Sequence, residues 1–190
     1  DDTELDTATF LQKLRASPQL PKTAAPPPAF YNPVYEKYVS RGESVIVVAP
    51  SAKVSGTVRA ATVAAQDFPG ADIRVVDTLT VAGNLATMVL MADQWAKEGQ
   101  DADRIVSGLN ELTLRQHTYF LVATLEYLKK GGRIGGAKAL LGEMLQVKPI
   151  LTIRDGQVEP YEQQRTKRKA RRGYRAGDGV TSGDRVVVRG

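Results

Sequence analysis

Two short β-branched runs, each followed by a helical segment, constrain the fold of this chain more than any other feature. Residues 44–49 (SVIVVA) lead through a loop into an alanine-rich segment, and residues 73–76 (IRVV) lead into a second segment with helical spacing. Continuous apolar runs of this length are typical of strands buried on both faces of a parallel sheet. Strands that alternate with helices predict an α/β fold in which helices flank a parallel sheet.

A second, smaller α/β unit is predicted in the later part of the chain. Residues 119–123 form an apolar run of strand length, and residues 137–145 place apolar side chains on one face of a short helix. The run KPILTI is followed by Asp155 and Gly156, a strong short-range signal for a β-hairpin. This unit is therefore expected to carry a hairpin packed beside a helix.

Charge is distributed unevenly along the 190 residues. The net charge is +5, but residues 165–190 hold nine Lys or Arg against two Asp, a net +7, which leaves the rest of the chain at −2. Together with the two predicted α/β units, this charge pattern divides the chain into an N-terminal α/β domain (residues 1–118), a second domain (residues 119–170) and a basic Gly/Arg-rich tail (residues 171–190). The tail is expected to be irregular.

The basic tail has two interpretations. It is either a solvated or disordered end of the chain, or a surface that contacts phosphate, nucleic acid or an acidic partner. Tyr174 is the only aromatic residue among these basic side chains, whereas surfaces that bind single-stranded nucleic acid interleave several aromatic rings with the charges. A nucleic-acid partner is therefore not expected.

The composition argues against several kinds of chemistry. The chain has no cysteine and one histidine, His117, so disulfides, thiol catalysis and a zinc site are not expected. Ser55 as a hydrolase nucleophile would lack the G-x-S-x-G motif and a histidine with an acidic partner, so no enzyme is expected. No apolar run reaches the roughly 18 residues of a membrane span, and the first residues, DDTELD, are unlike a signal peptide. The cytoplasm is the expected location.

The loop after the first β-branched run, PSAKVSGT, carries the candidate binding groups. A strand, a short loop and a helix N-terminus together present backbone N–H groups to an anion. Ser55 and Thr57 add hydroxyl donors, and Gly56 lets a ligand approach the backbone closely. Taken alone, this pattern is most often a plain helix cap.

Several motifs in this order resemble the DegV family of lipid-binding proteins, whose members carry long-chain fatty acids in the bacterial cytoplasm. They are TLEYLKKGGRIG, the strand and hairpin KPILTIRDGQV, and RTKRKA, with Ser55-Gly56-Thr57 matching the end of the family's Ser-Ser-x-Leu-Ser-Gly-Thr loop. The resemblance covers roughly residues 1–170. It implies a DegV-like α/β fold and non-covalent binding of a long-chain fatty acid, with a role in phospholipid metabolism.

The resemblance also implies roles for individual residues. Thr23, in a segment that stands where the family has Thr-Ser-Gln-Pro, and Ser55 would hold the fatty-acid carboxylate, with Gly56 and Thr57 supporting the loop. Arg133 and Arg165 would lie at an exposed rim. There a separate fatty-acid kinase would phosphorylate the bound acid to an acyl phosphate. The plain alternative for each arginine is a surface ion pair with a nearby Glu.

The implied partners are the fatty acid and the kinase. No cofactor or metal is implied beyond the bound lipid, and the protein itself would do no chemistry. We expect a monomer, and a lipid ligand is compatible with peripheral contact with a membrane.

The sequence also departs from the family pattern. A strand with an Asp-Ser-Thr motif is expected before the first helix and is absent, and His117 does not stand where the family has a carboxylate-binding histidine. After about Arg171 the expected helix and closing strands are missing as well. A member shortened at both ends is therefore expected. The alternative function is a truncated remnant that binds no lipid, or an interaction module that binds an acidic partner through its tail.

Overall fold

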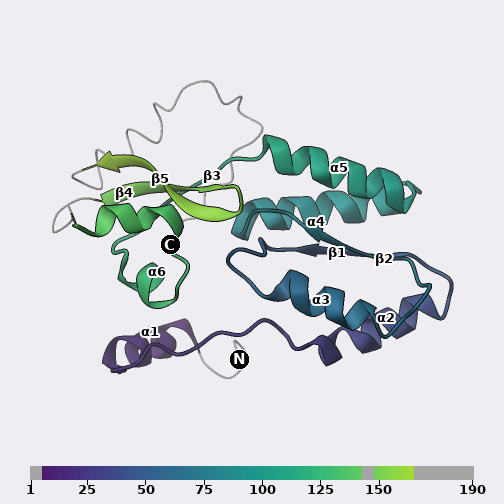
Figure 1. Ribbon diagram of the computed structural model, residues 1–190, viewed down its shortest axis with the longest axis horizontal. Helices are drawn as coiled ribbons and strands as arrows, with labels where there is room; N and C mark the ends of the chain where they lie inside the picture. The colour runs from purple at the N-terminus through teal and green to yellow at the C-terminus, as the bar shows by residue number, and fades with distance from the viewer. Residues whose placement is uncertain (1–5, 143–147, 165–190) are drawn as a thin grey trace.

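The computed structural model describes residues 6–142 and 148–164, and Figure 1 shows helices packed around two small sheets. One sheet has two parallel strands, and the other has three antiparallel strands. We call residues 28–115 the parallel unit and residues 118–164 the antiparallel unit. The predicted α/β class, with a parallel sheet and a hairpin in a second unit, is confirmed. The division of the chain at residue 118 stays a prediction.

The parallel unit is built as the alternation of strands and helices predicts. Strands β1 (Val45–Ala49) and β2 (Ile73–Asp77) pair in register, from Val45 opposite Ile73 to Ala49 opposite Asp77. Two helices lie on one face of this sheet and two on the other (Figure 1). They are α2 (Asn32–Val39) and α3 (Thr57–Ala65) on the first face, and α4 (Ala82–Lys97) and α5 (Ala102–Arg115) on the second.

One apolar cluster holds the second helical layer to the sheet. Val76 of β2 packs with Met88 of α4 and Leu109 of α5, and all three are buried. Full burial of a side chain of this size stabilises the fold by about 1.5–3 kcal/mol. Asp101 caps α5 by accepting the N–H of Arg104 at 2.8 Å, as its position before the helix predicts.

The antiparallel unit contains the predicted hairpin. Its strands are β3 (Thr118–Leu121), β4 (Lys148–Arg154) and β5 (Gln157–Gln164), paired in that order. Asp155 and Gly156 connect β4 to β5 with φ angles of 50° and 79°. Two successive positive φ angles belong to the tight turns whose twist matches that of the flanking strands. The Asp-Gly pair therefore forms the hairpin that the sequence predicts.

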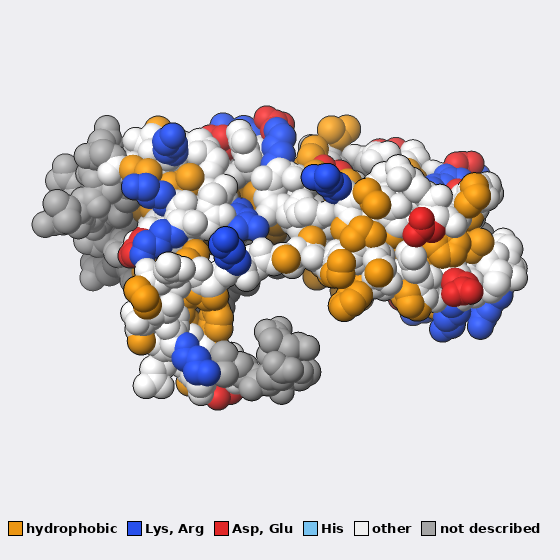
Figure 2. Space-filling model, turned by 60° about the horizontal axis from the view of Figure 1, so that its bottom comes forward, with side chains coloured by type: hydrophobic (Ala, Val, Ile, Leu, Met, Phe, Trp, Pro, Cys, Tyr) orange, Lys and Arg blue, Asp and Glu red, His pale blue; other side chains and the backbone are white. Residues whose placement is uncertain are grey.

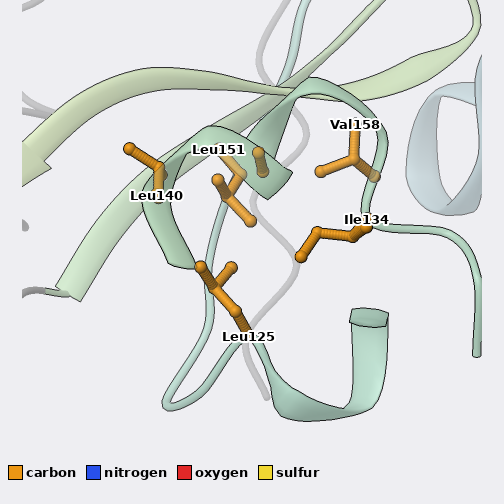
Figure 3. Close-up of a cluster of buried hydrophobic side chains, with 6 residues drawn as sticks. Leu125, Ile134, Leu140, Leu151 and Val158 are labelled. Carbon is orange, nitrogen blue, oxygen red and sulfur yellow. The ribbon is translucent and has the colours of Figure 1, made fainter. Parts of the chain in front are cut away.

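Helix α6 (Glu126–Lys130) and the 3₁₀ helix η2 (Gly135–Gly142) cover one face of this sheet. In Figure 3 the side chains between them point toward one another and form the core of the unit. They are Leu125, Ile134, Ala137, Leu140, Leu151 and Val158.

The helix predicted over residues 137–145 is observed only in part. The structure has the 3₁₀ helix η2 up to Gly142, and residues 143–147 lie outside the described part of the chain. Side chains three residues apart eclipse one another in a 3₁₀ helix, so Ala137 and Leu140 face the core together. Leu141 leaves that face and is partly exposed, contrary to its predicted place on the apolar stripe.

The first helix lies apart from both units (Figure 1). Helix α1 (Thr7–Ala16) is capped by Asp6, whose carboxylate accepts the N–H of Thr9 at 3.0 Å. The helix buries none of its residues, and the extended proline-rich segment after it leads to the 3₁₀ helix η1 (Pro28–Phe30). Among the helices that the structure describes, none is long and apolar enough to cross a membrane. The predicted tail, residues 171–190, lies outside the described residues.

Candidate functional site

The carboxyl ends of β1 and β2 carry two loops, residues 50–56 and 78–81, that are bonded to each other. The Asp77 carboxylate, at the end of β2, accepts the N–H of Ala52 at 3.2 Å and the N–H of Leu79 at 3.0 Å. Ser51 donates its N–H to the carbonyl of Thr80 at 2.9 Å. This is the edge of an open parallel sheet at which ligands bind in α/β proteins.

The predicted hydroxyl groups lie together at the start of α3. The Oγ of Ser55 is 2.9 Å from the Oγ1 of Thr57, and the N–H of Thr57 donates to the Ser55 Oγ at 3.3 Å. Gly56 is the N-cap of α3 and provides no side-chain cap. The positive end of the helix dipole and two half-buried hydroxyls therefore point to the same place, an arrangement that suits a carboxylate.

The segment that contains Thr23 packs against this loop. A Cβ on Gly56 would lie 3.4 Å from the Cβ of Ala25, so the absence of a side chain at Gly56 leaves room for the extended segment. Thr23 is exposed, two residues before this contact. The structure thus brings the Thr23 segment to the Ser55 loop across the sequence, as the resemblance implies. The roles of both residues stay predictions.

Arg133 reaches the same loop from the antiparallel unit. Its Nε donates to the carbonyl of Val54 at 3.2 Å, and its Nη1 donates to the carbonyl of Gly131 at 2.6 Å. Within the described part of the chain, the partners of this exposed guanidinium are carbonyl groups, one of them next to Ser55. Arg165, the second predicted rim residue, lies outside the described residues.

A large apolar groove runs beside the edge of β1 that faces away from β2. Its volume is about 960 Å³, and it lies between the helices of the two faces of the sheet. Pro26 lines it and is next in the chain to Ala25, the residue that lies against Gly56. Figure 2 shows hydrophobic side chains gathered on the half of the molecule that the parallel unit forms. Representative lining residues are Phe30, Tyr35, Val47, Val89 and Ile105.

Tyr35 connects the wall of this groove to α3. Its side chain is buried, and its hydroxyl donates to the carbonyl of Ala61 at 3.2 Å. Burial raises the pKa of the Tyr35 phenol above its ordinary value, because the ionised form would lose its water. Sequence reasoning missed the groove because its walls come from segments far apart in the chain.

Two other kinds of site, a hydrolase site at Ser55 and a metal site, can be compared with the described residues. The Ser55 hydroxyl pairs with that of Thr57, and the ring of His117 stacks on Tyr119 with centroids 6.3 Å apart. Within residues 6–142 and 148–164, no group of three or more His, Asp or Glu side chains could hold a metal ion.

Comparison with known proteins places this chain in one family. The model of the DegV family, described as uncharacterised proteins, matches residues 1–173. DegV domain-containing proteins of Deinococcus radiodurans and Streptomyces coelicolor are 36% and 37% identical over 170 and 171 residues. Each of these matches covers 90% of this chain and 60% of the relative. The chain therefore belongs to the DegV family and spans about 60% of the length of these relatives.

Solved structures of the family share the fold. A DegV family protein from Thermus thermophilus, described as binding fatty acid, is 40% identical with a TM-score of 0.81, over 89% of this chain and 61% of that one. DegV from Bacillus subtilis, described as a fatty acid binding protein, is 29% identical with a TM-score of 0.75, over 92% and 62% of the two chains. The predicted family is thus confirmed.

Proposed function

We propose that this chain binds a long-chain fatty acid non-covalently, with the carboxylate at the Ser55 loop and the acyl chain in the groove beside β1. The observation that carries the proposal is that one short segment, Ala25 and Pro26, contacts the loop at Gly56 and also lines the groove. The described binding of fatty acids by family members at 40% and 29% identity supports the same ligand class.

The chemistry of the Ser55 loop suits a carboxylate head. A buried carboxylate must exchange its water for hydrogen-bond donors, or its burial costs several kcal/mol. Ser55 and Thr57 supply hydroxyl donors, and Thr23 lies on the segment packed against them. Hydroxyl and helix N-terminal N–H groups do this without placing a full positive charge beside the acyl chain.

The groove suits the acyl chain. Each buried CH₂ contributes about 0.8 kcal/mol, so a long chain gains most of its affinity from apolar lining. The volume of about 960 Å³ falls within the usual range for sites that enclose small molecules, about 300–1,000 Å³.

Native mass spectrometry tests the proposal directly. The freshly purified chain is examined for a co-purified mass equal to that of a fatty acid, and stripped protein is then titrated with oleate. We expect one bound fatty acid per chain. A ligand-free mass together with no uptake of oleate would contradict the proposal and favour the alternative of a lipid-incompetent remnant.

We further propose that the bound acid is presented to a separate fatty-acid kinase, with Arg133 at the exposed rim. A guanidinium binds phosphate through two parallel N–H donors, and Arg133 lies beside Val54, one residue from Ser55. We expect Arg133→Ala to retain fatty-acid binding and to slow acyl phosphate formation by the kinase. A marked loss of fatty-acid affinity instead would place Arg133 in the carboxylate site.

The interaction-module alternative is tested separately. Removing residues 172–190 deletes most of the basic tail and none of the described residues. Lipid binding that survives this truncation supports the carrier function. Loss of an acidic partner in pull-down, in a chain that never binds lipid, supports the alternative.

A further inference from the structure

The turn of the β4–β5 hairpin is seated in the loops at the carboxyl end of the parallel sheet. Ser51 is fully buried, and its Oγ donates to the carbonyl of Gly156 at 2.6 Å, across 105 residues of sequence. This hydrogen bond joins Ser51, the second residue of the loop formed by residues 50–56, to the hairpin turn of the antiparallel unit.

The contact of the hairpin turn with Ser51 and Leu79, which we call the seat, leaves room only for a glycine at position 156. A Cβ on Gly156 would lie 2.4 Å from the Ser51 Oγ and 3.2 Å from the Cδ2 of Leu79. The φ angle of Gly156, +79°, also disfavours any other residue. The backbone of the turn therefore lies directly against both site loops.

Ser51 also fixes the shape of the loop that ends at Ser55. Its Oγ accepts the N–H of Lys53 at 3.2 Å, and its carbonyl accepts the N–H of Val54 at 3.1 Å and the N–H of Ser55 at 3.0 Å. One buried residue thus holds the hairpin turn on one side and the fold of the candidate carboxylate loop on the other.

We propose that Ser51 and Gly156 are positioning residues for the carboxylate site. The seated turn keeps Ser51 in the rotamer that supports the N–H of Lys53, and through it keeps the Ser55 hydroxyl where a carboxylate can bind. Arg133 approaches the same loop at Val54, so the seat also sets the distance between the rim and the head group. The ligand named in this inference rests on the proposed function.

A matched pair of glycine substitutions tests the seat. Gly156 and Gly99 have φ angles of +79° and +80°, so alanine is strained similarly at both. A Cβ on Gly99 meets nothing within 4 Å, whereas a Cβ on Gly156 meets Ser51. We expect Gly156→Ala to weaken oleate binding by at least about fivefold, and Gly99→Ala to leave it unchanged. Equal affinities in the two variants would overturn the inference.

Hydrogen exchange separates this inference from the proposed function. In ligand-free protein, the amides of residues 53–55 should exchange faster in Gly156→Ala than in Gly99→Ala. Ser51→Ala should accelerate exchange at Lys53 in particular, because it removes the acceptor of that N–H. Should the wild-type chain bind no oleate, the proposed function fails, and this exchange pattern still supports or overturns the seat.

The inference can still be tested if one variant fails to fold. If Gly156→Ala fails to fold, Ser51→Ala carries the comparison, with Ser40→Ala, at an exposed serine bonded to Lys37, as its control. Faster exchange at Lys53 with unchanged oleate affinity would show that the turn supports the loop but does not position the ligand site, and would overturn the inference.

Discussion

The two ends of the proposed lipid site are built in opposite ways. At the Ser55 loop, polar groups from β1, β2 and the hairpin turn are bonded to one another, and Ser51 and Thr78 are completely buried. In the groove beside β1, the lining is mostly apolar and partly open, with Phe30 72% exposed. The polar groups of the loop can orient and position a ligand, and the groove offers apolar surface for the ligand to cover. A ligand with a charged head and a long apolar tail matches this division.

The largest expected effect comes from placing a charge in the groove. Val89 and Leu90 are neighbours on α4, but only Val89 lines the groove. We expect Val89→Asp to weaken oleate binding by about 3 kcal/mol, because an acyl chain cannot cover a carboxylate that must keep its water, and the contacts of several CH₂ groups are lost. Isothermal titration measures the change.

Leu90→Asp is the matched control for this substitution. Leu90 is 67% exposed and lies outside the groove lining, so the same new charge on the same helix should leave oleate binding unchanged. Equal losses in the two variants would mean that the acyl chain does not occupy this groove.

A smaller effect is expected at the loop end. Ser55→Ala removes one of the two bonded hydroxyls and leaves a carboxylate short of a donor, which should weaken oleate binding by about 1–3 kcal/mol. Ser40→Ala, at an exposed serine whose hydroxyl bonds the carbonyl of Lys37, should change nothing. Titration with a fatty alcohol of equal length tests whether the loss concerns the carboxylate. Because the alcohol lacks the carboxylate, it should bind Ser55→Ala and Ser40→Ala with equal affinity. Unchanged oleate affinity in Ser55→Ala would remove Ser55 from the site.

Local sequence patterns predicted the parts of this molecule that depend on local physics. The β-branched runs became β1 and β2, and the Asp155-Gly156 pair became the hairpin turn, because strand burial and turn backbone are set by neighbouring residues. The position of Ser55 and Thr57 just after the first strand was also predicted, because it follows from neighbouring residues in the sequence. The 3₁₀ form of η2 was not predicted, since apolar spacing over so short a segment fits more than one helix type.

The parts that depend on long-range packing could not be predicted. The groove combines Phe30, Val47 and Val89, whose apolar character is also what an ordinary core requires. The bond between Ser51 and Gly156 spans 105 residues and involves a backbone carbonyl, which leaves no mark in the sequence. Arg133 likewise meets the carbonyl of Val54, a partner that charge patterning cannot indicate. The family resemblance supplied the pairing of Thr23 with the Ser55 loop, where neither periodicity nor composition would have joined them.

The smallest expected effect concerns Tyr35, which belongs to the groove wall and bonds α3 behind the Ser55 loop. Tyr35→Phe keeps the ring and removes the hydrogen bond to Ala61, so we expect a loss of about 0.5–1.5 kcal/mol in the free energy of unfolding and little change in oleate affinity.

The pH dependence of the stability of Tyr35→Phe gives a second measure. Burial raises the pKa of the Tyr35 phenol above its ordinary value of 10.0, so the unfolded chain loses this proton first as pH rises. The contribution is complete below about pH 10 and is lost above it. Urea unfolding between pH 8 and 11 should therefore show a shallower alkaline decline in Tyr35→Phe than in the wild type. Parallel declines would mean that Tyr35 ionises as readily in the folded protein as in the unfolded chain, and that the groove wall is wet at this point.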